Sequence, residues 1–235
     1  MFRLAPLWVL AAAVGSAQSS EEILARVANS TIKRYAISYS GLREYKLRNV
    51  RFAKEATVIV QEAYCPSEGK QFTVLERSGS TKLIGIVEKL LASEAEASGP
   101  EKRSDHGINP TNYEAQLRGT GTIDGRVSYV IGIKAKRKSK YLINGTLWVD
   151  PSSYSMVRLE GSAAASVSMW IGSPQIVQEF SEIAGLWLPS RIWSVSSGML
   201  LGTSQLEIRY TGYRVMGADT VATRVVGFHP GPRGK

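Results

Sequence analysis

Residues 141–161, YLINGTLWVDPSSYSMVRLEG, decide the fold class because they predict two β-strands joined by a tight turn. Leu147 and Trp148 point to opposite faces, as the period of two of a β-strand requires. Asp150 and Pro151 then predict the turn, since an Asp side chain accepts hydrogen bonds from nearby backbone and Pro presets φ. The register of this hairpin decides whether Trp148 faces an interior cavity or solvent.

Similar strand patterns lie on both sides of this hairpin. The cleanest alternation runs from Val127 to Ile133, directly after the hairpin signal Asp124-Gly125. A long strand is predicted from Tyr35 to Leu47, with a kink or bulge at Gly41. Further strands are predicted at residues 57–64, 71–76, 113–117, 163–171, 176–183, 191–196, 200–215 and 221–228. About ten strands at regular spacing, with two helices early in the chain, predict one large antiparallel sheet.

Two helices are predicted in the first half of the chain. Ser19 and Glu22 have the spacing of a capping box, and apolar residues follow at helical spacing. The second helix begins at residue 81 and has a wide apolar face. Glu94 and Glu96 near its end are interpreted as a solvated helix terminus rather than as a carboxylate pair. Residues 101–110 are polar and turn-rich, which is typical of either a mobile flap or a simple connection.

The first 17 residues predict a signal peptide. Arg3 supplies the positive charge, and the apolar run after it, about 11 residues long, is too short for a spanning helix, which needs ~20. The small residues ending at Ala17 provide a cleavage site. We therefore expect an exported, soluble product with a single domain at residues 18–228 and a flexible tail at residues 229–235.

The chain is basic, with 29 Lys and Arg against 20 Asp and Glu. Because these cations are scattered, we expect no nucleic-acid partner. The one cluster, from Lys134 to Lys140, lies between two strands; a solvated loop is the simpler interpretation, and a phosphate or lipid headgroup contact is the alternative. Cys65 is the only cysteine, so no intramolecular disulfide and no Cys-based metal site are expected.

Candidate catalytic residues are few. Ser104, Asp105 and His106 have the residue types of a catalytic triad, but neighbours in one loop cannot form triad geometry among themselves. The segment Gly119-Thr120-Gly121 lacks the Lys and the helix start of a phosphate-binding loop. We therefore expect no enzyme, no metal and no cofactor, and a hydrolase that uses His106 is the weakest alternative.

Hydrophobic residues suggest a binding cavity instead. Such a cavity would be built from the apolar face of the second helix and from aromatic residues of the later strands. Burying about ten methylenes of an acyl chain yields roughly 8 kcal/mol, which corresponds to a dissociation constant on the order of micromolar before binding costs are subtracted. The predicted cavity residues are Leu83, Val87, Leu90, Leu91, Tyr129, Trp148, Trp170, Trp187 and Trp193.

The segment Gly145-Thr146-Leu147-Trp148-Val149-Asp150-Pro151, followed by Tyr154 and by Val157-Arg158-Leu159-Glu160-Gly161, resembles bacterial proteins of the LolA-like superfamily. The order of elements is also similar: a signal peptide, a helix, long strands, an inserted helix, and then a series of strands. This superfamily includes periplasmic lipoprotein carriers and RseB-type envelope sensors. The resemblance implies an α+β fold, in which an incomplete antiparallel β-barrel wraps around helices and encloses an apolar cavity for acyl chains.

These observations together predict a non-enzymatic, periplasmic carrier that binds a lipid or a lipoprotein. The alternative is an envelope sensor or scaffold that binds another envelope protein through the same sheet. The expected partners are therefore acyl chains or lipoproteins, with an envelope protein as the alternative and a transient contact with a membrane surface compatible with the basic charge.

Overall fold

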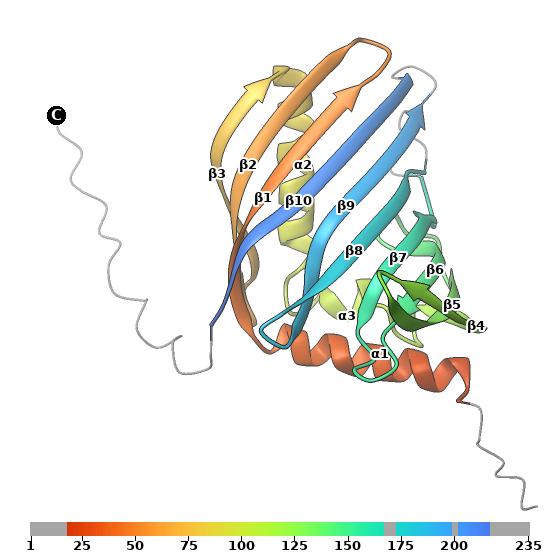
Figure 1. Ribbon diagram of the computed structural model, residues 1–235. Helices are drawn as coiled ribbons and strands as arrows, with labels where there is room; N and C mark the ends of the chain where they lie inside the picture. The colour runs from red at the N-terminus through yellow and green to blue at the C-terminus, as the bar shows by residue number, and fades with distance from the viewer. Residues whose placement is uncertain (1–17, 167–172, 199–201, 217–235) are drawn as a thin grey trace, which may run out of the picture.

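A computed structural model of the chain describes residues 18–166, 173–198 and 202–216 (Figure 1). The predicted signal peptide, the tail, Trp170 and the predicted strand at residues 221–228 lie outside these residues. The helices are α1 (Ser20–Tyr35), α2 (Thr81–Ala97) and α3 (Arg103–His106). The strands are β1 (Ser38–Asn49), β2 (Lys54–Cys65), β3 (Gly69–Gly79), β4 (Tyr113–Ile123), β5 (Arg126–Ala135), β6 (Ile143–Val149), β7 (Met156–Ala163), β8 (Gln175–Ile183), β9 (Leu186–Gly198) and β10 (Gly202–Met216).

All ten described strands form one sheet in the order β3-β2-β1-β10-β9-β8-β7-β6-β5-β4. Every neighbouring pair is antiparallel, and the first and last described strands of the chain, β1 and β10, lie side by side. The edge strands β3 and β4 stand at opposite ends of this order, so the curved sheet is an open barrel (Figure 1). The predicted fold class, an incomplete antiparallel barrel with helices, is confirmed.

The hairpin of β6 and β7 forms as the sequence predicts. Asp150 Oδ1 accepts hydrogen bonds from the backbone N–H groups of Ser152 and Ser153, at 3.0 and 2.7 Å, and so fixes the turn. Leu147 is fully buried, whereas Trp148 on the opposite face donates a hydrogen bond to Glu160 at 3.1 Å. Trp148 therefore lies on the outer face of the sheet, and the residues on either side of it, Leu147 and Val149, point to the inner face.

The helices pack against the sheet at two different places. The Ser19 side chain caps α1 by accepting a hydrogen bond from Glu22 N at 3.1 Å, as predicted. In Figure 1, α1 crosses one end of the sheet, while α2 runs along the inner side of β1, β2 and β3. The short helix α3 lies in the segment that was expected to be irregular.

Two hydrophobic clusters fill most of the interior. The first, here called the α1 cluster, joins α1 to the inner face of β4 to β8 and includes Ile23, Ile131 and Leu147. The second, here called the α2 cluster, joins α2 to β1, β2 and β10 and includes Tyr45 and Val87. Because each helix covers only its own part of the sheet, a junction remains between these two clusters, where a third and smaller cluster contains Tyr39, Tyr64 and Leu188.

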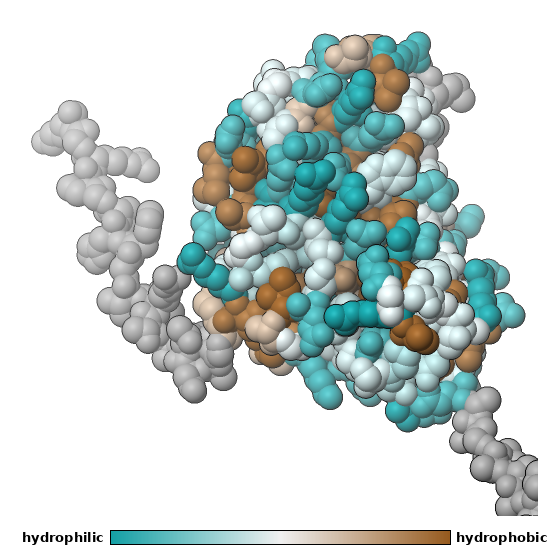
Figure 2. Space-filling model, viewed as in Figure 1, coloured by the Kyte–Doolittle hydropathy of each residue, from teal (hydrophilic) through white to brown (hydrophobic). Residues whose placement is uncertain are grey.

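The outer face of the sheet is largely polar, with scattered hydrophobic patches (Figure 2). Opposite charges pair there, as in the contacts of Glu207 on β10 with Arg191 on β9, at 3.0 Å, and with Arg209 on its own strand, at 2.8 Å. These exposed ion pairs contribute little to stability. They do show which side of the sheet faces water.

Two further predictions have clear outcomes. The bulge expected at Gly41 is present, because the register of β1 against β10 shifts between Ser40 and Leu42. A strand was expected over residues 163–171, but β7 ends at Ala163 and residues 164–166 are irregular. The small residues of this segment have weak strand propensity, and the remainder of the predicted strand, residues 167–171, lies outside the described residues.

Candidate functional site

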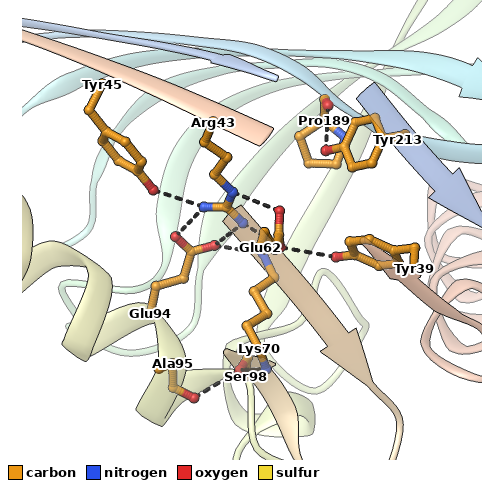
Figure 3. A network of polar contacts seen from close by, with 10 residues as sticks. All are labelled: Tyr39, Arg43, Tyr45, Glu62, Lys70, Glu94, Ala95, Ser98, Pro189 and Tyr213. Carbon is orange, nitrogen blue, oxygen red and sulfur yellow. Dashed lines mark hydrogen bonds and ion pairs between the residues drawn. The ribbon is translucent and has the colours of Figure 1, made fainter. Parts of the chain in front are cut away.

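A network of buried charges occupies the junction between the two clusters (Figure 3). Arg43 on β1 is paired with Glu62 on β2 at 2.5 Å and with Glu94 on α2 at 2.8 Å. Lys70 on β3 contacts Glu94 at 2.6 Å and Glu62 at 3.4 Å. The side chains of Arg43 and Glu62 are each 1% exposed, so this pair is removed from water. Two cations and two carboxylates make the network neutral.

The four charges hold one another in the ionised state. Burial would raise the pKa of Glu94, but Lys70 and Arg43 outweigh that effect and hold the pKa well below its usual value. Burial opposes the charge of Glu62 as well, and the same two cations again lower its pKa. For Lys70 the signs are reversed. Burial would lower the pKa of Lys70, but Glu94 and Glu62 outweigh burial and hold this pKa well above its usual value. The network therefore stays charged at neutral pH.

Aromatic side chains surround this network. Arg43 lies 4.8 Å from the ring centroid of Phe72 and 4.7 Å from that of Tyr210, and its guanidinium donates a hydrogen bond to Tyr45 OH at 2.9 Å. Burial raises the pKa of Tyr39 to about 12, so its hydroxyl stays neutral. Together these rings give the charges a rigid apolar frame in which cation–π contacts are favourable.

Beside the network lies an interior pocket of about 260 Å³. Lys70 and Glu94 form its polar wall, and Glu94 keeps 35% of its side chain exposed at this wall. The α1 cluster contributes apolar and aromatic lining, including Tyr113, Leu159 and Phe180. The strands of the sheet also contribute lining residues, namely Tyr39, Tyr64, Tyr113, Ile143, Met156, Leu159, Gln178, Phe180 and Pro189.

Two arginines stand where this pocket meets α1 and the segment before β4. Arg34 and Arg103 both line the pocket, and each guanidinium lies over the ring of Tyr35, at 5.1 and 5.4 Å from the centroid. Arg103 also donates a hydrogen bond to Tyr64 OH at 2.6 Å. The positions of these cations suit a polar or anionic group at the end of an apolar ligand.

His106 lines the same pocket without the partners of a catalytic base. Its ring contacts that of Tyr141 at a tilt of 40°, with centroids 4.4 Å apart, and its Nδ1 is buried without a hydrogen-bond partner among the described residues. In this part of the chain no group of three or more His, Cys, Asp or Glu side chains is placed to hold a metal.

A larger depression of about 520 Å³ lies outside the barrel, between α1 and the turns after β6 and β8. Arg26, Arg34, Ser153 and Glu182 give it a polar lining. Trp187 is at its edge, where Arg126 lies 5.4 Å from the ring. Its polarity makes it a poor acyl-chain site, whereas the smaller interior pocket has a mainly apolar and aromatic lining beside its charged residues.

The structure does not bring the predicted cavity residues together. Leu83, Val87 and Leu91 are buried in the α2 cluster as core residues and do not line the interior pocket. Leu90 is 40% exposed. Tyr129 and Trp187 pack against the other cluster. Trp193 is 41% exposed on the outer face of the sheet, because the preceding residue, Ile192, points inward to the α2 cluster. Trp148 also lies on the outer face. Within the described residues, the set is therefore divided among two cores and the outer surface.

Sequence reasoning missed the charged network. Glu94 was interpreted as part of a solvated helix end, but it lies in the network, and only Glu96 is exposed. A signal was available in β1 and β2. On β1, Arg43 is two residues from the buried Tyr45 and therefore points inward, whereas Glu44 between them points outward. On β2, Glu62 points inward in the same way, because it lies two residues from each of Val60 and Tyr64. Opposite charges at inward positions of neighbouring strands indicate a buried pair.

Comparisons with known proteins give similarity in structure only. No protein-family model matches the sequence, and no curated protein matches it. A LolA superfamily protein of Nitrosomonas europaea is 14% identical with a TM-score of 0.44, over 86% of this chain and 95% of the other. A domain described as outer membrane lipoprotein-sorting, from Vibrio parahaemolyticus, is 9% identical with a TM-score of 0.43, over 82% and 93%. The Pseudomonas aeruginosa complex of MucA and MucB gives 9% identity and a TM-score of 0.26, over 85% and 99%.

With identities of 14% or less and TM-scores below 0.5, these similarities support no conclusion about what this chain binds. The open ten-stranded sheet is established by its own strand order. Function is therefore argued from the interior pocket.

Proposed function

We propose that this protein is a non-enzymatic periplasmic carrier that holds an acyl chain of a lipid or a lipoprotein in the interior pocket. The observation that carries the proposal is the pocket itself, which lies between two filled hydrophobic clusters and is lined mainly by apolar and aromatic side chains. An unfilled apolar space inside a small domain costs stability, because its lining forgoes packing contacts. A ligand that fills the space recovers them.

The size and charge of the pocket narrow the ligand class. At about 260 Å³ it lies just below the range of roughly 300–1,000 Å³ that is typical of small-molecule sites. One acyl chain suits this volume better than several. The neutral network places no net charge on the inner wall, whereas Arg34 and Arg103 favour a polar or anionic end group. The ligand that fits best is an amphiphile with one buried chain.

Export supports a site of action in the periplasm. The sequence of the first 17 residues has the charge, the apolar run and the small residues of a signal peptide. Among the described residues, no helix is long and apolar enough to cross a membrane. A carrier that is released after cleavage near Ala17 would meet lipids and lipoproteins in that compartment.

Native mass spectrometry of the purified protein, followed by lipid extraction, tests this proposal. We expect a bound species that contains an acyl chain, and saturable binding of a fluorescent fatty-acid probe to the delipidated protein. A protein that carries no lipid and does not bind the probe would refute the carrier function.

The second candidate is a sensor or scaffold that binds another envelope protein through the sheet. The observation in its favour is Trp193, which is 41% exposed on the outer face among charged neighbours. Exposed tryptophans are enriched among the residues that dominate protein–protein binding. Capture of one specific envelope protein that is lost in Trp193→Ala, with the probe site empty, would favour this candidate over the carrier.

A further inference from the structure

The connection between β1 and β2 exposes two large hydrophobic side chains at one end of the sheet. Val50 is 49% exposed and Phe52 is 52% exposed. The backbone around them is held in place, because Asn49 Oδ1 accepts a hydrogen bond from Phe52 N at 3.0 Å and Val50 N donates one to Thr203 O at 2.9 Å. An ordered tip therefore presents apolar side chains to water, which costs free energy in the isolated protein.

Cations surround these two hydrophobic residues. Arg48 is 61% exposed, and the guanidinium of Arg51 lies 5.8 Å from the ring centroid of Phe52. Lys54 follows at the start of β2, and it shares a shallow depression with Lys82 in the first turn of α2. We call residues 48–54 together with Lys82 the basic tip.

Cations outnumber carboxylates in this part of the sequence. Glu55 also lines the depression, and its carboxylate is 3.9 Å from Arg48, with both side chains mostly exposed. Residues 48–55 together with Lys82 contain the four cations Arg48, Arg51, Lys54 and Lys82 and the one carboxylate Glu55. Such a surface attracts anions at a distance of about one Debye length, roughly 8 Å at physiological salt.

The location of the tip matters as much as its composition. It lies at the end of the sheet opposite to α1, where the chain turns from β1 into β2 (Figure 1). Figure 2 shows hydrophobic and hydrophilic surface side by side at this end. A flat surface could therefore approach the tip without meeting α1 or the cations beside the interior pocket.

We propose that the basic tip binds the surface of an anionic lipid bilayer. Phe52 and Val50 enter the interfacial region, where aromatic and aliphatic side chains of membrane-bound proteins reside, and the four cations contact lipid phosphates. The occupant is a bilayer because its anionic headgroups and apolar interior match both halves of the tip at once. The contact involves no residue of the interior pocket, so it stands or falls separately from the carrier function.

Co-sedimentation with vesicles tests the proposal. Wild-type protein is mixed with vesicles of phosphatidylethanolamine and phosphatidylglycerol, and separately with vesicles of phosphatidylcholine alone, at low and at physiological salt. We expect binding to the anionic vesicles that weakens as salt rises, and little binding to the neutral ones. The double variant Val50→Ser/Phe52→Ser should bind the anionic vesicles about tenfold more weakly, because it loses the buried apolar area.

A matched control is available at another hairpin. Val127 is 59% exposed beside Arg126, directly after the turn between β4 and β5. Val127→Ser should leave vesicle binding unchanged, and all variants should keep the wild-type thermal unfolding midpoint because the substituted side chains are exposed. Lys54→Gln/Lys82→Gln should weaken binding to the anionic vesicles only.

Three results would overturn the proposal. The first is equal binding of the wild type to the anionic and neutral vesicles. The second is unchanged binding of Val50→Ser/Phe52→Ser, or an equal loss in Val127→Ser. The third is no binding to either kind of vesicle, which would make a protein partner the occupant of the basic tip.

Discussion

The two halves of the sheet meet the interior in different ways. Under α1, the cluster around Leu147 is apolar and filled around this fully buried side chain, and its members Leu159 and Phe180 line the interior pocket. Under α2, the cluster around Tyr45 adjoins the buried pair of Arg43 and Glu62, and this side reaches the pocket through the charged side chains Lys70 and Glu94. This difference indicates why space stays open where the charged network meets the apolar core. Ion pairs keep their partners at fixed distances, so their side chains cannot move in to fill a gap as aliphatic side chains can.

The largest effect is expected from breaking the buried pair. Glu62→Gln removes one carboxylate from Arg43 and Lys70 and leaves excess positive charge in a site that is closed to water. We expect a loss of about 3 kcal/mol or more in the free energy of unfolding, measured by urea titration.

The outer-face carboxylate Glu207, which contacts Arg191 and Arg209, is the matched control. Glu207→Gln should cost less than about 1 kcal/mol, because its partners are exposed. If both variants lost the same free energy of unfolding, the buried ion pairs would contribute no more to stability than the exposed ones.

A cavity in the filled half should lower stability without affecting the ligand site. Leu147→Ala deletes a fully buried side chain of the α1 cluster and should cost about 2–5 kcal/mol. Probe affinity should stay within about twofold of wild type, because Leu147 does not itself line the interior pocket, and its cross-strand partner Leu159, which does line it, is left in place. A strong loss of binding in a variant that remains folded would contradict the separation of core and pocket.

Acid should weaken the junction gradually. The folded-state pKa of Glu94 lies below its unfolded value of about 4.3. Its stabilising contribution is therefore complete above that unfolded pKa and is lost as pH falls through the folded pKa. The stability difference between wild type and Glu94→Gln, from urea titrations at several pH values, should be largest near pH 7 and narrow below about pH 4. A difference that stays constant over this range would show that Glu94 is not held by Lys70 and Arg43.

Much of the fold could be predicted from the sequence because its signals are local. The alternation around Leu147, the turn at Asp150, the cap at Ser19 and the bulge at Gly41 each depend on neighbours within a few residues. Local rules fix these features, and the open antiparallel sheet follows from adding the strands together.

The candidate site could not be predicted in the same way. Its members Arg43, Glu62, Lys70 and Glu94 come from three strands and a helix, and they meet only because β1, β2, β3 and α2 pack together. Trp148 and Trp193 looked suited to a cavity by composition, but each follows or precedes an inward residue and therefore points outward. One position of register decides the side of the sheet, and composition carries no information about it.

Filling the interior pocket tests the central claim most directly. Ala97, near the end of α2, lines the pocket, whereas Ala92 on the same helix is exposed. Ala97→Phe should occupy the space that an acyl chain would take, and the control Ala92→Phe adds the same side chain at the surface. Titration of a fluorescent fatty-acid probe should show affinity lowered at least about tenfold in Ala97→Phe, the loss expected from excluding about two methylenes, and unchanged in Ala92→Phe. Equal probe affinity in both folded variants would contradict the assignment of the acyl-chain site to this pocket.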